Sequence, residues 1–149
     1  MKLKNYTSAV SPERSVISIE KILVDIGATY IVKIYENSRL SGITFQIDYE
    51  GKPMLFKLPA NEQAIEDIMK SEIKKPRENT QSRIEEQAQR TAWKLLLDWV
   101  SVQASMVLIG RRSVIEVFLP YAYNKQQNRT FYEYLQQSKF AMLQKENPL

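Results

Sequence analysis

The feature that most constrains the fold is a long series of apolar residues at helical spacing between residues 81 and 109. Steps of three and four residues place these side chains along one side of an α-helix. A helix of this length would extend roughly 43 Å at 1.5 Å per residue. The main apolar stripe consists of Ile84, Ala88, Ala92, Leu95, Trp99, Val102 and Met106, with Leu96 beside it.

The second half of this predicted helix carries another apolar stripe on a different side. It consists of Trp93, Leu97, Val100, Ala104 and Val107. A helix that is apolar on two sides must be covered on both, either by the rest of the chain or by a second copy. We therefore expect a homo-oligomer, in the simplest case a dimer, with this region at the interface.

Capping and turn residues predict the elements before the long helix. Ser11 and Pro12 mark the start of a helix that ends at Gly27, a residue able to adopt positive φ. A polar stretch at 74–81 separates the long helix from a preceding one, which Asn61 is expected to cap; Thr80 is the expected cap of the long helix itself. Strands are predicted at 29–35, 43–50 and 54–58, and the preceding helix at 62–73.

The predicted fold class is α+β, in one domain over residues 1–149. Short connections between the strands favour a three-stranded antiparallel meander, with the N-terminal helix on one face. The long central helix and short C-terminal helices follow. One short helix is expected at 113–119, where a strand is the alternative, and another after Thr130, whose spacing to Glu133 is that of a capping box. The lead-in at 1–10 and the tail from 141 are expected to be flexible.

The composition excludes several kinds of chemistry. The 149 residues include no cysteine and no histidine, which rules out disulfides, thiol nucleophiles, Ser-His-Asp triads and zinc fingers. We expect no enzyme activity, no cofactor and no metal. The chain has no apolar segment long enough to cross a membrane and no secretory signal, so we expect a cytoplasmic protein. The net charge is +4, of which residues 101–149 contribute +3, and this favours an anionic partner.

A row of polar and basic residues lies on one face of the predicted long helix. Arg83, Gln87, Arg90 and Lys94 follow one another at i, i+4, i+7 and i+11. We expect this face to point away from the core and to bind phosphates, together with Lys74, Lys75 and Arg77 just upstream. Trp93 could then stack on a base if it is exposed. The alternative is a solvated helix face on which Glu85 and Glu86 pair with these cations.

A second candidate site is rich in aromatic residues and lies near the C-terminus. Aromatic rings beside cations suit stacking on a nucleobase and binding its phosphates. The alternative is that the tyrosine rings cover the edge of the core. The rings are Tyr121, Tyr123, Phe131, Tyr132 and Tyr134, and the cations that could converge on them are Arg111, Arg112, Lys125 and Arg129.

The carboxylates of the predicted helices are expected to be surface groups. They are Glu62, Glu66 and Asp67 on one helix and Glu85 and Glu86 on the next. Paired carboxylates can bind Mg²⁺ or act as acid and base, but no spacing here matches a known metal-binding loop. We therefore predict no metal site.

Two resemblances extend the argument. The order helix–strand–strand–strand–helix, with KKPR at 74–77 before the closing helix, resembles a double-stranded-RNA-binding domain, in which lysines at that point hold phosphates. The chain differs from that family by its additional helix and by a strand connection, ENSRLSG at 36–42, that lacks the family's histidine. The segments ERSVISIEKIL (13–23), PMLFKLP (53–59), EEQAQRTAWKLLLDWV (85–100) and EVFLPY (116–121) resemble an uncharacterised group of small proteins encoded by phages and mobile elements.

Together these patterns favour a non-enzymatic phage-type accessory or counter-defence protein. Its expected ligand is nucleic acid or a nucleotide, bound through the basic helix face. The alternative is a protein–protein inhibitor, with a host protein as its target, or a structural assembly factor without a nucleotide ligand. Salt dependence distinguishes a polymer contacted at several phosphates from a small nucleotide in a pocket.

Overall fold

The predicted α+β architecture is confirmed by the structure, a computed structural model that describes residues 2–110 and 112–144. The elements in chain order are α1 (Pro12–Asp25), β1 (Tyr30–Glu36), β2 (Arg39–Tyr49), β3 (Lys52–Pro59), α2 (Glu62–Ser71), α3 (Thr80–Leu108), α4 (Val114–Phe118), the 3-10 turn η1 (Leu119–Tyr121), β4 (Ala122–Asn124), β5 (Arg129–Thr130) and α5 (Phe131–Gln137). The 29-residue α3 is the long helix that the periodicity predicts. Segment 113–119 is helical, as predicted, and not a strand.

The strands form one antiparallel sheet in the order β1-β2-β3-β4-β5. Tight turns at Asn37–Ser38 and Glu50–Gly51, all four residues with positive φ, join the first three strands. The predicted count of three strands is wrong by two, because β4 and β5 extend the meander at β3. These strands have only three and two residues, too few for an alternating pattern to be recognised in the sequence.

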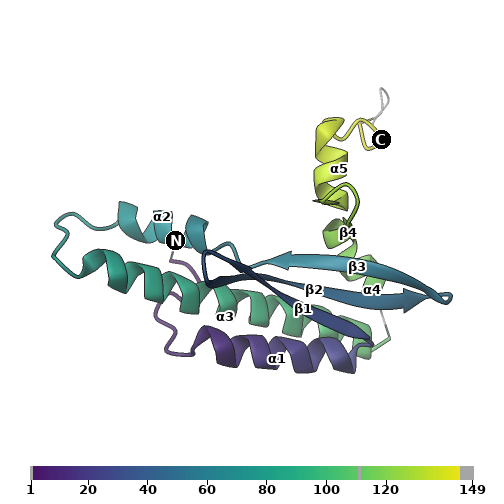
Figure 1. Ribbon diagram of the computed structural model, residues 1–149, viewed down its shortest axis with the longest axis horizontal. Coiled ribbons are helices and arrows are strands. Elements are labelled where there is room, and N and C mark those ends of the chain that lie inside the picture. The colour runs from purple at the N-terminus through teal and green to yellow at the C-terminus, as the bar shows by residue number, and fades with distance from the viewer. Residues whose placement is uncertain (1, 111, 145–149) are drawn as a thin grey trace.

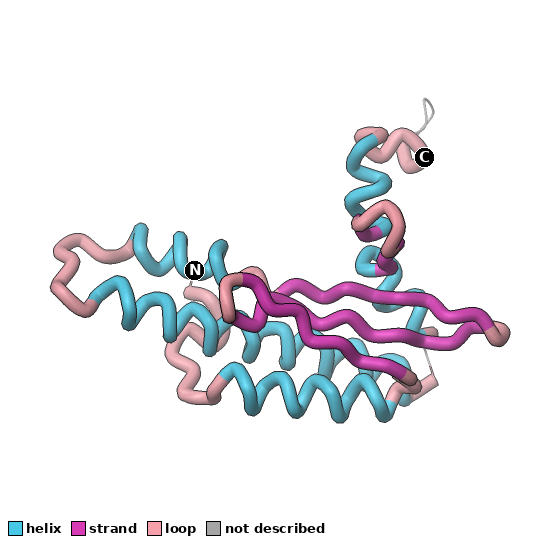
Figure 2. The backbone as a smooth tube through the Cα atoms, viewed as in Figure 1, coloured by secondary structure: helices cyan, strands magenta, loops and turns pink. Residues whose placement is uncertain are grey.

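One face of the sheet packs on helices and the other is open. Opposed residues share a face, and the pair Phe45↔Phe56 points toward α1 and α3, whereas the pair Thr44↔Lys57 points away. Figures 1 and 2 show α1 and α3 side by side beneath the first three strands, with no element over most of the other face. Gly42 is required in β2, since a Cβ there would lie 2.8 Å from the Leu58 carbonyl oxygen.

Most of the two apolar stripes of α3 is covered within this chain, but Val102 of the first stripe is 61% exposed. Trp93, Val100 and Ala104, on the second stripe, belong to the same buried core as Ile84 and Ala88 on the first. The cover comes from α1, α2 and the sheet. These residues of the second stripe are buried by the protomer itself and do not require a second copy, and the homo-oligomer stays a prediction.

The segment before α1 lies against α3. We call residues 2–10 the N-terminal strap; it has turns but no helix or strand. Thr91, which is fully buried, donates from Oγ1 to the backbone oxygen of Asn5 at 3.0 Å. The sequence predicts a flexible lead-in here, whereas the structure places the strap in hydrogen-bonded contact with the helix.

Residues 122–144 form a C-terminal arm that stands out from the sheet (Figure 1). The arm begins as β4, paired with β3 through Leu55↔Tyr123. Just before it, Trp99 of α3 packs edge-on against Phe118 and Tyr121, with ring centroids 5.5 and 5.3 Å apart. The arm is therefore attached through strand pairing and through the aromatic part of the core.

Candidate anion-binding site

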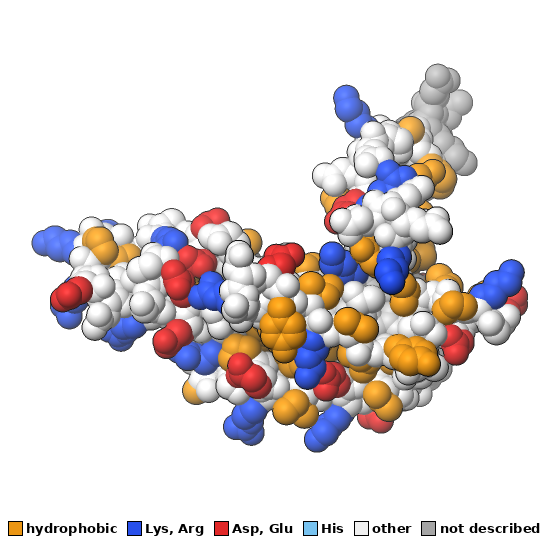
Figure 3. Space-filling view, in the orientation of Figure 1, with side chains coloured by type: hydrophobic (Ala, Val, Ile, Leu, Met, Phe, Trp, Pro, Cys, Tyr) orange, Lys and Arg blue, Asp and Glu red, His pale blue; other side chains and the backbone are white. Residues whose placement is uncertain are grey.

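A hollow of about 550 Å³ lies between the end of α2, the start of α3 and the N-terminal strap. We call it the basic cleft, because four cations line it. Two come from the loop between α2 and α3 and two from α3 itself; they are Lys75, Arg77, Arg83 and Arg90. Gln87 also lines the cleft, so five of the residues predicted from the sequence to bind phosphates lie together. Figure 3 shows Lys and Arg side chains at the end of the molecule where this loop lies.

The four cations of the basic cleft have no carboxylate partner within 4 Å among the described residues. Some cations near the cleft are paired, for example Arg39 with Glu85 at 3.2 Å and Lys70 with Glu66 at 2.6 Å. The cleft is lined by one carboxylate, Glu86, against four positive charges. It is therefore a concentration of positive charge suited to an anion.

Gln87 orients one of these cations. Its Nε2 donates to the backbone oxygens of Tyr6 and Ser8 in the strap, at 3.0 and 3.1 Å. This fixes the amide so that Oε1 accepts from Nε and Nη2 of Arg90, at 3.3 and 3.0 Å. A guanidinium group has five N–H donors, so three of them remain for a ligand. The strap therefore helps to orient Arg90 in the cleft, because it holds the Gln87 amide that accepts from this guanidinium group.

Tyr6 joins the strap to the other wall of the cleft. Its hydroxyl donates to Oε2 of Glu72, at the end of α2, over 3.0 Å. This hydrogen bond, and to a smaller extent burial and the charge of Glu72, raise the pKa of Tyr6 above its ordinary value. No sequence pattern indicates this contact, because Tyr6 and Glu72 are far apart in the chain and neither belongs to a periodic pattern.

The structure corrects the prediction for Lys94. This lysine is half-buried and donates to Asp98 at 2.7 Å, so it is not part of the basic cleft. Asp98 also accepts from Asn5 at 2.9 Å and from Lys4 of the strap. Partial burial acts to raise the pKa of Asp98, but the hydrogen bonds from Asn5, Lys4 and Lys94 outweigh it and hold the pKa well below its usual range. The predicted basic face therefore ends at Arg90.

Trp93 is completely buried and cannot stack on a base. Its Nε1 donates to Oε1 of Glu62, in the first turn of α2, over 2.9 Å. The expectation of an exposed ring is wrong because Trp93 belongs to the second apolar stripe of α3, which α2 helps to cover.

The C-terminal candidates separate into different environments. Tyr121 packs on Trp99 at the edge of the core, as the alternative interpretation expected, and Arg112 pairs with Glu116 on the surface. Arg111 lies outside the described residues. Tyr123 and Arg129 remain together and line a second hollow between the sheet and the arm, which we call the arm cleft. The predicted convergence of all the C-terminal cations is therefore wrong for Arg112.

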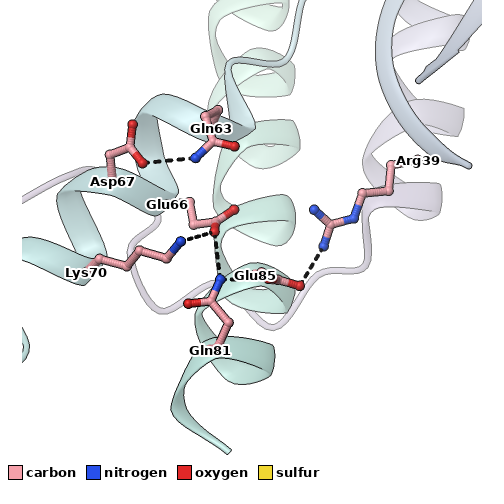
Figure 4. A network of polar contacts seen from close by, with 7 residues as sticks. All are labelled: Arg39, Gln63, Glu66, Asp67, Lys70, Gln81 and Glu85. Carbon is pink, nitrogen blue, oxygen red and sulfur yellow. Dashed lines mark hydrogen bonds and ion pairs between the residues drawn. The ribbon is translucent and has the colours of Figure 1, made fainter. Parts of the chain in front are cut away.

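The carboxylates of α2 and α3 form a network that ties the two helices together (Figure 4). Glu66, which is buried, accepts from Lys70 and from Gln81, and Gln81 also donates to Glu85 at 2.7 Å. Glu85 in turn pairs with Arg39 of β2 and not with the cations of its own helix face. Among residues 2–110 and 112–144, no three acidic side chains are grouped so as to hold a metal ion.

Comparisons do not assign the chain to a known group. No family model, no curated protein and no solved structure matches it. The predicted phage or mobile-element origin therefore stays a prediction. In the part of the chain that the structure describes, none of the helices is both long and apolar enough to span a membrane.

Proposed function

We propose that this protein binds nucleic acid and holds the sugar–phosphate backbone in the basic cleft. The observation that carries the proposal is that Lys75, Arg77, Arg83 and Arg90 line one hollow without a carboxylate partner among the described residues. Crowding like charges is unfavourable, and an anion bound between them relieves their repulsion. Phosphates would supply the missing negative charge.

The spacing of the cations favours a polymer over a single nucleotide. Arg83 and Arg90 are seven residues apart on one face of α3, which corresponds to about 10.5 Å along the helix axis. One strand of a duplex carries a charge roughly every 3.4 Å along its axis, so the pair alone spans about three phosphates. Lys75 and Arg77, in the exposed loop beyond the helix start, extend the row further.

The same proposal includes a biological role for nucleic-acid binding. The resemblance to phage and mobile-element proteins suggests an accessory or counter-defence function in which binding, without turnover, is the activity. The first experiment establishes the class of ligand, because both the accessory and the counter-defence function depend on which ligand is bound.

The test is the salt dependence of oligonucleotide binding, measured by fluorescence anisotropy with a labelled 20-nucleotide strand. With four phosphate contacts, affinity for a single strand should fall roughly 50-fold between 50 and 200 mM salt. The double variant Arg83→Gln/Arg90→Gln should bind more weakly at both salt concentrations. Its affinity should fall only roughly sevenfold over the same salt range, because two phosphate contacts remain.

The matched control is Arg14→Gln/Lys21→Gln. These two exposed cations of α1 have the same seven-residue spacing and lie outside the basic cleft, so the variant loses the same net charge. It should keep the steep salt dependence of the wild type. Absence of binding to any oligonucleotide would overturn the proposal and favour a protein partner. A shallow salt dependence, with competition by a mononucleotide, would overturn the polymer in favour of a small ligand.

A further inference from the structure

The arm cleft is a second hollow, of about 620 Å³, in the angle between the open face of the sheet and the C-terminal arm. Its volume lies within the range of pockets that hold small molecules or single nucleotides. The floor comes from β2 and β3 and the wall from the arm. The residues that matter for its chemistry are Gln46, Leu55, Tyr123, Lys125, Arg129 and Tyr134.

The cleft is formed in advance of any ligand. Strand pairing fixes Tyr123 directly opposite Leu55, on the open face of the sheet. Tyr123 also donates from its hydroxyl to Oδ1 of Asn128, over 2.6 Å, which holds the turn between β4 and β5. The Thr130–Glu133 capping box fixes the start of α5 and therefore the position of Tyr134. Because few side chains and loops of the cleft have to be ordered on binding, the entropic cost of ordering them takes little from the affinity.

Aromatic rings at the cleft lie beside cations that have no ion-pair partner within the described part of the chain. Arg129 lies over the ring of Tyr134, 4.8 Å from its centroid, and Lys57, which lies just outside the lining, is 5.2 Å from the centroid of Tyr123. Arg129 donates to the side-chain oxygens of Gln127, at 2.9 Å, and Gln137, and no carboxylate of residues 2–110 or 112–144 pairs with it. None of the acidic residues that the structure describes lines the cleft, whereas four side-chain amides do: Gln46, Asn124, Gln126 and Gln127.

We propose that the arm cleft binds unpaired nucleobases, so that the nucleic acid bound by this protein is single-stranded. This inference rests on the function proposed above and specifies its substrate. Aromatic rings stack on bases of any sequence, amides hydrogen-bond to base edges, and cations take the adjoining phosphates. A duplex hides the faces of its bases in the stack, so it could use the basic cleft but not the arm cleft.

The experiment compares two tyrosines of α5. Tyr134 lines the cleft and is 49% exposed; Tyr132 is 51% exposed but lies outside the cleft, beside Phe140. In anisotropy titrations with a labelled 20-nucleotide strand, Tyr134→Ala should weaken binding roughly 5- to 150-fold, from the stacking of one base. Tyr132→Ala should stay within about twofold of the wild type, and Tyr134→Ala should leave binding of a 20-base-pair duplex unchanged.

A second variant tests the arm cleft without changing an aromatic side chain, whose loss could also disturb packing. Lys125, an exposed residue of the β4–β5 turn, can be changed to Glu without burying a charge. Lys125→Glu should weaken single-strand binding more than Lys139→Glu, which makes the same charge change on the arm outside the cleft.

The outcomes separate the two proposals. If Arg83→Gln/Arg90→Gln weakens binding but Tyr134→Ala and Lys125→Glu behave like their controls, the arm cleft has no role and the single-strand inference is overturned. If the wild type binds neither the strand nor the duplex, the proposed function itself fails. Equal weakening of strand and duplex by Tyr134→Ala would also overturn the assignment to unpaired bases.

Discussion

The two clefts of this molecule are built by different forces, although both are lined with cations. The strap supplies one wall of the basic cleft, and polar contacts attach it to α3. Gln87 and Thr91 hydrogen-bond to the backbone of the strap, and Asp98 accepts from side chains of the strap. The wall of the arm cleft is attached by strand pairing and by packing of Phe118 and Trp99.

This difference bears on what each cleft can recognise. The basic cleft offers four charges and the partly buried ring of Tyr6, whose hydroxyl is already engaged by Glu72, so it suits the repeating phosphates of a backbone. The arm cleft offers rings and amides on a fixed floor, so it suits the flat faces and polar edges of bases. An anchored apolar wall should be hard to displace, whereas a wall held by hydrogen bonds should respond to pH.

The largest effect is expected at the base of the arm. Phe118 is completely buried and its ring contacts those of Phe45, Phe56 and Trp99. Phe118→Ala should lower the free energy of unfolding by about 3–5 kcal/mol, because it leaves a cavity where four rings meet. Denaturant titration followed by tryptophan fluorescence measures this. Leu119→Ala, at the exposed neighbouring position, is the control and should cost far less. Equal costs for the two variants would show that the arm is not anchored through the core.

A smaller effect is expected at the strap. Asp98→Asn removes the carboxylate that accepts from Lys4, Asn5 and Lys94, and should cost about 1 kcal/mol at neutral pH, since the side chain is partly exposed. The pKa of Asp98 is lower in the folded chain than its ordinary value of 3.8, so its contribution is complete above that pH and is lost as the pH falls further. The difference between variant and wild type should therefore shrink in acid.

Hydrogen exchange identifies where this effect acts. The amides of Tyr6 and Ser8 are hydrogen-bonded within the strap and should exchange faster in Asp98→Asn, while amides of the sheet should be unaffected. If sheet amides accelerate equally, the strap is part of the global core, and the contrast between the two walls is lost.

The local parts of this structure could be predicted from the sequence. Ser11 caps α1 as expected, accepting from the backbone N of Arg14 at 3.3 Å, and Gly27 has a φ of +108°. The placement of Arg83, Gln87 and Arg90 on one face also follows from spacing within a single helix. The predicted cap at Asn61 is wrong in mechanism, because that residue adopts a φ of 55° and its side chain makes no capping hydrogen bond.

Thr80 likewise differs from its predicted role as a cap. It is the first residue of α3, and its hydroxyl accepts from the backbone N of Arg77 at 2.6 Å.

The parts that could not be predicted depend on contacts between distant segments. The strap has no periodic pattern, and contacts with Gln87, Thr91 and Asp98 place it on α3. The burial of Trp93 depends on where α2 packs, and the arm cleft depends on two-residue pairings between β3 and β4. Spacing along a helix identifies a face, but it does not identify what covers that face.

The smallest effect is expected at α2, the remaining wall of the basic cleft. Burial raises the pKa of Glu62, an effect that the hydrogen bond from Trp93 reduces. The folded chain therefore binds this proton more tightly than the unfolded chain, and stability should fall as the pH rises above the ordinary value of 4.5. Glu62→Gln keeps an oxygen for the Trp93 indole and removes the charge. It should show a weaker pH dependence between pH 4 and pH 7 than the wild type, and be at least as stable at pH 7, in denaturant titrations. A variant less stable than the wild type at pH 7 would mean that the charge itself, through Arg39, holds α2 in place, and both walls of the basic cleft would then depend on ion pairs.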